Sequence, residues 1–148
     1  MPVQFELVTP ERLLVSTAVE MVVVPGGEGN FGVLPGHAPL ISTIRPGTVD
    51  IYENRAITER IFVVGGIAEV TPDRVTVLAD EAMSLDSLDR AALQSELQVI
   101  EGNLPSLRDQ VGRATGTDRE RLAAELQALE RQDSVARAKL QVLGELSR

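Results

Sequence analysis

Residues 21–36 read MVVVPGGEGNFGVLPG, and this stretch sets the class of fold for the first half of the chain. Its apolar residues 21–24 stop at Pro-Gly-Gly, and a second short run, residues 31–34, stops at Pro-Gly. β-Branched residues favour strands, whereas proline and glycine at this spacing are typical of turns. We therefore predict short strands joined by turns.

The same stretch contains the pattern G-x-G-x-x-G at residues 27–32, which is found in dinucleotide-binding loops. That interpretation requires a helix to begin directly after the glycines, so that its N-terminus can hold the pyrophosphate. Residues 33–36, Val-Leu-Pro-Gly, cannot open a helix, so a glycine-rich hairpin or bulge is favoured. Because no Lys-Ser or Lys-Thr pair follows a glycine-rich loop, the NTPase phosphate loop is also excluded, and we predict no bound cofactor.

Short apolar or alternating runs separated by turn residues continue on both sides of this stretch. They comprise residues 3–7, 18–24, 31–34, 40–44, 49–52, 57–64, 67–70 and 75–79. Strands at this spacing predict an antiparallel β-sandwich or barrel over residues 1–83, rather than strands that alternate with helices.

The composition changes near residue 83, where glycine and proline become rare and Leu, Ala, Glu, Gln and Arg dominate. Apolar residues recur at a 4-3-4-3-4 spacing over residues 93–111, and again over 122–143 with Asp133 as a polar member. This spacing places each set on one face of a helix. Gly116 and the capping-box pattern Thr117-x-x-Glu120 lie between them. Residues 84–148 are thus predicted to form an antiparallel α-helical hairpin, with its second helix at 118–146.

Pro105 lies within the first helical stripe. A proline inside a helix removes one hydrogen bond and clashes one turn back, at a cost of about 3 kcal/mol. Because the apolar stripe keeps its phase across Pro105, we expect a kinked helix; a break into two shorter helices is the alternative.

The composition excludes several classes of function. The 148 residues contain no cysteine and one histidine, so disulfides, thiolate sites and nitrogen-rich metal sites are not expected. Residues 1–83 carry 5 Arg and no Lys against 11 acidic residues, a net charge of −6, which argues against nucleic-acid binding. No secretory signal opens the chain and no apolar run approaches the roughly 20 residues that span a bilayer, so we expect membrane association only through a partner.

His37 and three basic residues of the last helix are the remaining candidates for a specific role. His37 lacks the nucleophile and orienting carboxylate that a catalytic base needs, so packing or a partner contact is favoured over catalysis. Arg131, Arg137 and Lys139 are interpreted either as a solvated helix face or as a surface for an acidic partner or a phosphate.

The first 83 residues resemble a known family. The resemblance rests on FELVTP at residues 5–10, VPGGEG with GVLPGHAPL over 24–40, RPGTV at 45–49, FVVGGIAEV at 62–70 and VTVLADEA at 75–82. These stretches occur in the order found in ε subunits of bacterial F-type ATP synthases, whose mitochondrial counterpart is called δ. The segment ARAKLQV at residues 136–142 also resembles the terminal helix of that family.

The resemblance implies a non-catalytic rotor subunit of the central stalk that helps to couple rotation to ATP synthesis. Its β-sandwich is expected to bind the γ subunit and the c-subunit ring, and the loop with Glu28 and His37 to approach that ring. It implies a peripheral location at the cytoplasmic face of the bacterial plasma membrane, reached only through the complex.

The helical part resembles the regulatory arm of the family, which in its extended state inhibits ATP hydrolysis. Arg131, Arg137 and Lys139 are then expected to face an acidic loop of the catalytic β subunits within the α/β ring. Some relatives bind ATP through an Ile/Leu-Asp-x-x-Arg-Ala pattern at the start of the hairpin. Residues 85–91, LDSLDRA, place the Arg-Ala pair one position later, which argues against nucleotide binding without excluding it.

Two other interpretations stay open. A free-standing adaptor with a β-sandwich and a coiled hairpin explains the pattern and the charge equally well, but not the order of the glycines and prolines. An enzyme with paired carboxylates around the glycine-rich loop needs carboxyl groups with shifted pKa values in one cleft.

Overall fold

The computed structural model describes residues 2–146, with the side chain of Leu146 excepted. The chain divides into two compact units, Met1–Ser87 and Leu88–Arg148, and each is described by itself. The sequence placed the boundary between residues 83 and 84. It falls later because a short strand and a turn of 3-10 helix, Leu85–Ser87, complete the first unit.

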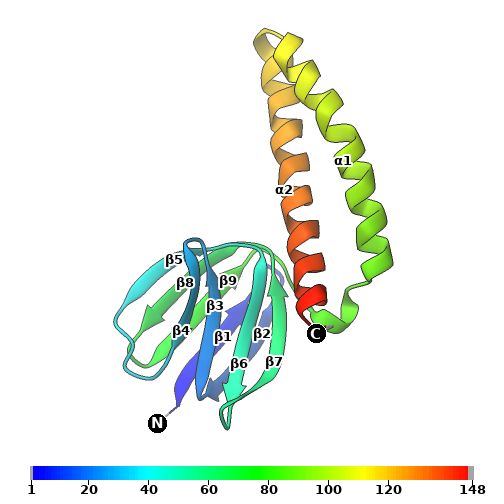
Figure 1. Cartoon of the computed structure of the whole chain (residues 1–148). Coiled ribbons are helices and arrows are strands. Elements are labelled where there is room, and N and C mark those ends of the chain that lie inside the picture. Colours follow the sequence, from blue (N-terminus) through cyan, green and yellow to red (C-terminus); the bar gives the residue numbers. More distant parts are fainter. Residues whose placement is uncertain (1, 147–148) are drawn as a thin grey trace. The chain divides into compact units, whose positions relative to one another are not determined.

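The first unit is built from short strands, numbered in chain order, most of which Figure 1 labels. They are β1 (Val3–Val8), β2 (Leu13–Val19), β3 (Met21–Gly26), β4 (Gly29–Val33), β5 (Leu40–Ile44), β6 (Gly47–Glu53), β7 (Ala56–Val63), β8 (Gly66–Thr71), β9 (Arg74–Ala79) and β10 (Ala82–Ser84). Their order in the sheet is β10-β7-β6-β3-β5-β8-β9-β1-β2, with β4 paired to β3. The predicted fold class, a β-sandwich followed by a helical hairpin, is confirmed.

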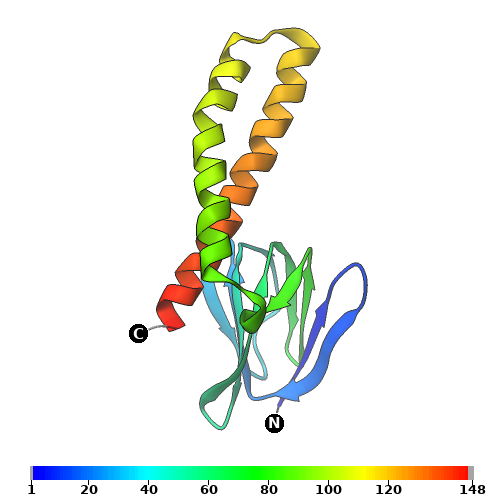
Figure 2. The ribbon, with the colours of Figure 1, turned by 90° about the vertical axis from the view of Figure 1, so that its right-hand side faces the viewer.

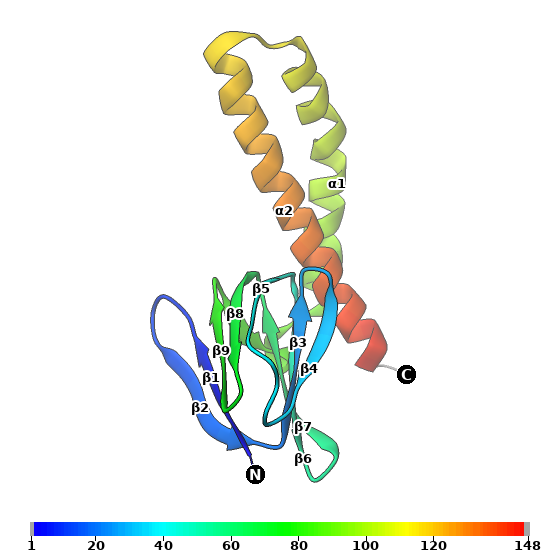
Figure 3. The ribbon, with the colours of Figure 1, turned by 90° about the vertical axis from the view of Figure 1, so that its left-hand side faces the viewer.

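The sheet folds over into two layers, which Figures 2 and 3 show from opposite sides. The layers are joined where β3 meets β5 at the single pair Gly26–Ile44. Alternate residues of each strand point inward, as the period of two requires. The shared core contains the fully buried Phe5 and Leu7 together with many valines of both layers. Burying each of these side chains stabilises the fold by about 1.5–3 kcal/mol.

Several details of the sandwich differ from the sequence prediction. The run expected at residues 18–24 is divided at Glu20 between β2 and β3. Strand β1 pairs with β9 in parallel, whereas the other strand pairs are antiparallel. The short β10 pairs with the end of β7. Strand β2 was missed because most of its residues are at least partly exposed and show no regular alternation.

The second unit is an antiparallel hairpin of two helices, α1 (Arg90–Arg113) and α2 (Gly116–Leu146). Asp89 caps α1, and its carboxylate accepts a hydrogen bond from the backbone N–H of Ala92 at 3.2 Å. The prediction that Thr117 caps the second helix is wrong, because α2 already begins at Gly116. The positive φ of Gly116, 62°, forms the turn that follows Thr115.

Pro105 lies within α1, and the helix runs through it without a break. The predicted apolar stripe faces the hairpin interior at Ile100 and Leu104, which are buried. Because a single helix spans Arg90–Arg113, the alternative of two shorter helices is wrong. Neither helix of the described residues is long and apolar enough to cross a bilayer.

Candidate interaction surfaces

Within residues 2–146 the structure brings together no group of three His, Asp or Glu side chains able to hold a metal ion. From the sequence, surface residues remained as the candidates for a functional role. Three candidate surfaces are built from different parts of the fold: the β3–β4 hairpin, the outer face of the β8-β9-β1-β2 layer, and helix α2.

Glu28 lies at the tip of the β3–β4 hairpin, in the two-residue turn between Gly26 and Gly29, and is exposed. This turn is tied to the adjacent end of β5. The backbone N–H of Gly27 donates to the carbonyl oxygen of Thr43 at 2.8 Å, and the N–H of Arg45 donates to that of Pro25 at 2.9 Å.

The side chain of Arg45 adds two further bonds to the same hairpin. Its Nη1 donates to the carbonyl oxygen of Gly26 at 2.6 Å, and its Nη2 donates to Oδ1 of Asn30 at 2.5 Å. Hydrogen bonds from a charged donor are stronger than neutral ones. These bonds hold the backbone of the turn that carries the exposed Glu28.

An open groove of about 470 Å³ runs beside this hairpin. Its lining residues come from two short segments, 28–31 and 40–43, and mix acidic, polar and apolar side chains. Ligand pockets for small molecules are more enclosed and mostly apolar. The groove is better suited to a loop of a protein partner than to a cofactor.

His37 lies in the connection between β4 and β5 and is half-buried. Its Nδ1–H donates to the carbonyl oxygen of Ala38 at 2.7 Å, and its backbone N–H donates to that of Leu34 at 3.1 Å. Glu28 precedes β4 and His37 follows it, so the two residues lie at opposite ends of a five-residue strand. We expected one loop to carry both side chains, but β4 separates them, so they do not belong to the same loop.

A row of apolar side chains crosses the outer face of the other layer. Ile67 on β8 pairs with Leu78 on β9, Leu78 pairs with Val8 on β1, and Val8 pairs with Leu13 on β2. Ile67, Leu78 and Leu13 are 48%, 47% and 57% exposed. We call these four residues the apolar row; it spans roughly 14 Å across four strands.

Ile41 on β5 lies on the same face as the apolar row and is 73% exposed. Contiguous exposed apolar residues mark interaction sites, whereas single ones do not. This surface was not predicted from the sequence, because it contains none of the charged or catalytic residue types that mark a site. The signal was available: Ile67 and Leu78 are large apolar residues at positions that alternate with the buried ones.

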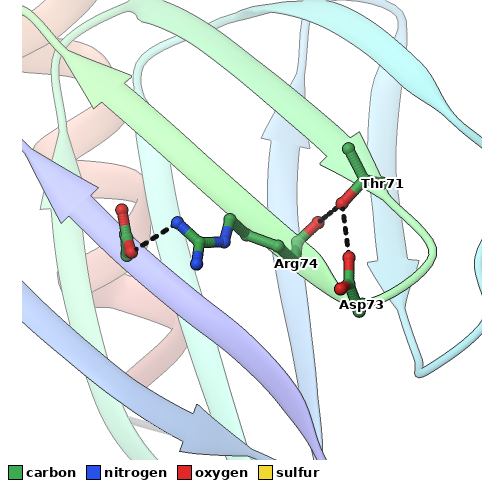
Figure 4. Close-up of polar contacts among 4 residues, drawn as sticks. Thr71, Asp73 and Arg74 are labelled. Carbon is green, nitrogen blue, oxygen red and sulfur yellow. Dashed lines mark hydrogen bonds and ion pairs between the residues drawn. The ribbon is translucent and has the colours of Figure 1, made fainter.

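A polar cluster flanks the apolar row (Figure 4). Nη1 of Arg74 on β9 contacts Oε1 of Glu6 on β1 at 2.9 Å, which ties these parallel strands together. The hydroxyl of Thr71 donates to Oδ1 of Asp73 at 3.0 Å in the turn before Arg74. The outer face thus has an apolar centre and a polar margin, as protein interfaces do.

The three basic residues of α2 do not form one patch. At about 100° per residue, Lys139 lies about 80° around the helix from Arg131 in one direction, and Arg137 lies about 120° from it in the other. Arg131 is exposed, and no described carboxylate lies within 4.0 Å of it. Lys139 is half-buried.

Arg137 is exposed at the surface of the hairpin and forms ion pairs on both helices. Its Nε contacts Oδ2 of Asp133 at 2.9 Å on the same helix, and its Nη2 contacts Oε1 of Glu101 on α1. The hydrogen bond and charge of Asp133, followed by the charge of Glu101, raise the pKa of Arg137 above its ordinary value.

Comparisons with known proteins give a consistent result. A model of the family described as the ATP synthase delta/epsilon chain, beta-sandwich domain, matches residues 2–85. The ATP synthase epsilon chain of Rhodospirillum rubrum is 50% identical over 125 residues, which span 84% of this chain and 93% of that one. The ATP synthase epsilon chain of Rhodospirillum centenum is 53% identical over 124 residues, spanning 82% of each chain.

Two solved structures share the fold. A chain of the Euglena gracilis mitochondrial ATP synthase, in the OSCP/F1/c-ring assembly, superposes with a TM-score of 0.70 at 20% identity, covering 96% of this chain and 81% of that one. A chain of the Tetrahymena thermophila mitochondrial ATP synthase central stalk and c-ring gives a TM-score of 0.50 at 12% identity, covering 59% and 69%. At these identities the likeness shows the fold alone.

Proposed function

Since the chain belongs to the ATP synthase delta/epsilon chain family, as its sequence pattern predicted, we propose that it couples rotor movement to ATP synthesis and restrains ATP hydrolysis. It is a non-catalytic subunit, and its site is a set of surfaces rather than a reaction centre. The proton-translocating complex would then hold the chain at the cytoplasmic face of the bacterial plasma membrane, as a peripheral subunit.

The apolar row is the single observation that carries this proposal. Its residues belong to four adjacent strands, so a partner can cover them together without any change in the sandwich. Burial of apolar surface of this kind is the main favourable term in protein association. We assign this face to the γ subunit of the central stalk.

The β3–β4 hairpin is assigned to the c-subunit ring. Its turn is exposed, and hydrogen bonds that involve Arg45 and Gly27 connect it to the end of β5. A rigid acidic turn suits a contact that transmits torque, because a flexible loop would yield before the ring turned. His37, at the other end of β4, has no part in this contact.

Helix α2 is assigned to inhibition of ATP hydrolysis. Its 31 residues span roughly 46 Å at 1.5 Å per residue, which is long enough to reach from the foot of a stalk toward the catalytic α and β subunits. Arg131 is exposed and suited to an acidic loop of those subunits. The hairpin and the extended form must differ by only a few kcal/mol for conditions to switch between them.

We also propose that the hairpin works without a bound nucleotide. The displaced Arg-Ala pair in residues 85–91 supports this, and so does the contact of Arg90, whose Nη2 donates to the carbonyl oxygen of Leu143 at 2.9 Å. Calorimetry of the isolated chain should give no binding heat at millimolar ATP. Saturable binding in that range would contradict this part of the proposal.

Truncation tests the inhibitory role. A chain that ends at Ser87 keeps β10 and its pairing with β7, so the first unit stays whole. The complex reconstituted with it should assemble normally and hydrolyse ATP faster than the complex with the full chain. Normal assembly with unchanged hydrolysis would refute inhibition by the helices, while leaving the stalk assignment in place.

A further inference from the structure

Arg137 bridges the two helices of the hairpin through side chains of opposite charge. We propose that Glu101 acts as an internal competitor for Arg137, so that α2 offers this arginine to an acidic partner only after it separates from α1. The inference rests on the proposed inhibitory role of α2 and names the residue that restrains it.

The geometry gives the two acidic residues different roles. Asp133 precedes Arg137 by four residues on α2, so it stays beside the guanidinium wherever the helix goes. Glu101 lies on α1 and loses Arg137 when the helices part. Asp133 therefore orients the guanidinium in both states, whereas only Glu101 distinguishes the closed state from the open one.

The environment of Asp133 makes the closed hairpin easier to open. Its side chain is 19% exposed, and its Oδ1 is buried with no hydrogen-bond partner among the described residues. A buried oxygen without a partner costs free energy that hydration recovers. Opening of the hairpin exposes this oxygen to water and removes that free-energy cost. In the closed hairpin, the favourable contact between Glu101 and Arg137 offsets the same cost.

The other basic residues serve as internal references. Arg131 has no described carboxylate within 4.0 Å, so it is available in both states. The second ion pair between the helices, Arg108–Glu130, has a nitrogen–oxygen distance of 3.8 Å and both side chains are about half exposed. It is the weaker of the two contacts, and the restraint is concentrated at Glu101.

The test is the substitution Glu101→Gln in the full chain, which keeps the shape of the side chain and removes its charge. Exposed ion pairs of this kind change an equilibrium by about twofold to fivefold. The open population should rise by that factor. Glu96→Gln makes the same change of charge at an exposed position of α1 and should leave the population unchanged.

Opening is measured directly, by the distance between spin labels at Asn103→Cys on α1 and Gln127→Cys on α2, exposed uncharged positions, in otherwise cysteine-free chains. In an Arg137→Gln background, Glu101→Gln should have no further effect, because the charge for which it competes is gone. Equal distance distributions for Glu101→Gln and Glu96→Gln would overturn the inference. ATP hydrolysis by the same complexes is the separate readout of inhibition: an open hairpin with unchanged hydrolysis supports the restraint and rejects the proposed function.

Discussion

Ile67 on β8 lies directly opposite Leu78 on β9, and both side chains point away from the core with about half of their surface exposed. Each is followed along its strand by a buried alanine, Ala68 or Ala79. In both strands, the inward-facing residues pack in the core of the sandwich, and the outward-facing residues form a surface. Stability and partner binding can be changed independently on this face.

Leu78→Ser should weaken binding to the γ subunit without unfolding the sandwich. Removing a large apolar side chain from the centre of an interface typically costs more than about 1 kcal/mol, so we expect the dissociation constant to rise about tenfold. Ile57→Ser, at an exposed apolar residue of β7 outside the apolar row, is the matched control. Binding kinetics with immobilised γ subunit provide the measurement, and equal affinities for both variants would remove the apolar row from the interface.

Arg45→Ala should loosen the β3–β4 hairpin. The substitution removes the bonds to Gly26 and Asn30, each of which contributes about 1–3 kcal/mol because the donor is charged. Amide hydrogen exchange in residues 27–30 should accelerate at least tenfold while the core strands stay protected. Arg55→Ala, in the exposed β6–β7 turn, serves as the control, and exchange at wild-type rates in Arg45→Ala would show that the backbone bonds alone hold the hairpin.

Alanine in place of glycine should have opposite effects in the two units. Gly66 has a φ of 128°, and a Cβ there would lie 2.0 Å from the carbonyl oxygen of Leu78. Gly66→Ala should therefore destabilise the sandwich by more than about 1 kcal/mol. Gly102 lies in the interior of α1 with open space around it, so Gly102→Ala should stabilise the hairpin by about 0.5–1 kcal/mol.

Thermal unfolding followed by circular dichroism checks both glycine substitutions. The melting temperature should fall for the first and rise or stay level for the second. A tolerated Gly66→Ala would mean that β8 and β9 do not approach each other at Gly66 as described.

Much of the sandwich could be predicted from the sequence, because proline and glycine mark the turns and the period of two marks the buried side of each strand. The exceptions share a physical reason. Strand β2 is exposed along most of its length, so burial leaves no pattern in its sequence. The parallel pairing of β1 with β9 joins residues about 70 positions apart, and local sequence does not specify such contacts.

The candidate site was predicted less completely. The exposed positions of Glu28 and Arg131 agree with contacts to partners, which stay a prediction for both residues. His37 could not be placed, because its position relative to Glu28 depends on where β4 begins and ends. The role of Arg137 depends on Glu101, thirty-six residues earlier, and only the register of the two helices brings them together.

The most direct test of the stalk assignment uses a single cysteine at residue 78. Because the natural chain contains no cysteine, a photoactivatable crosslinker attached at Leu78→Cys reports on one position only. In the assembled ATP synthase it should form its main crosslink with the γ subunit, in high yield. A complex that assembles without any crosslink to γ, or a chain that never joins the stalk, would contradict the account.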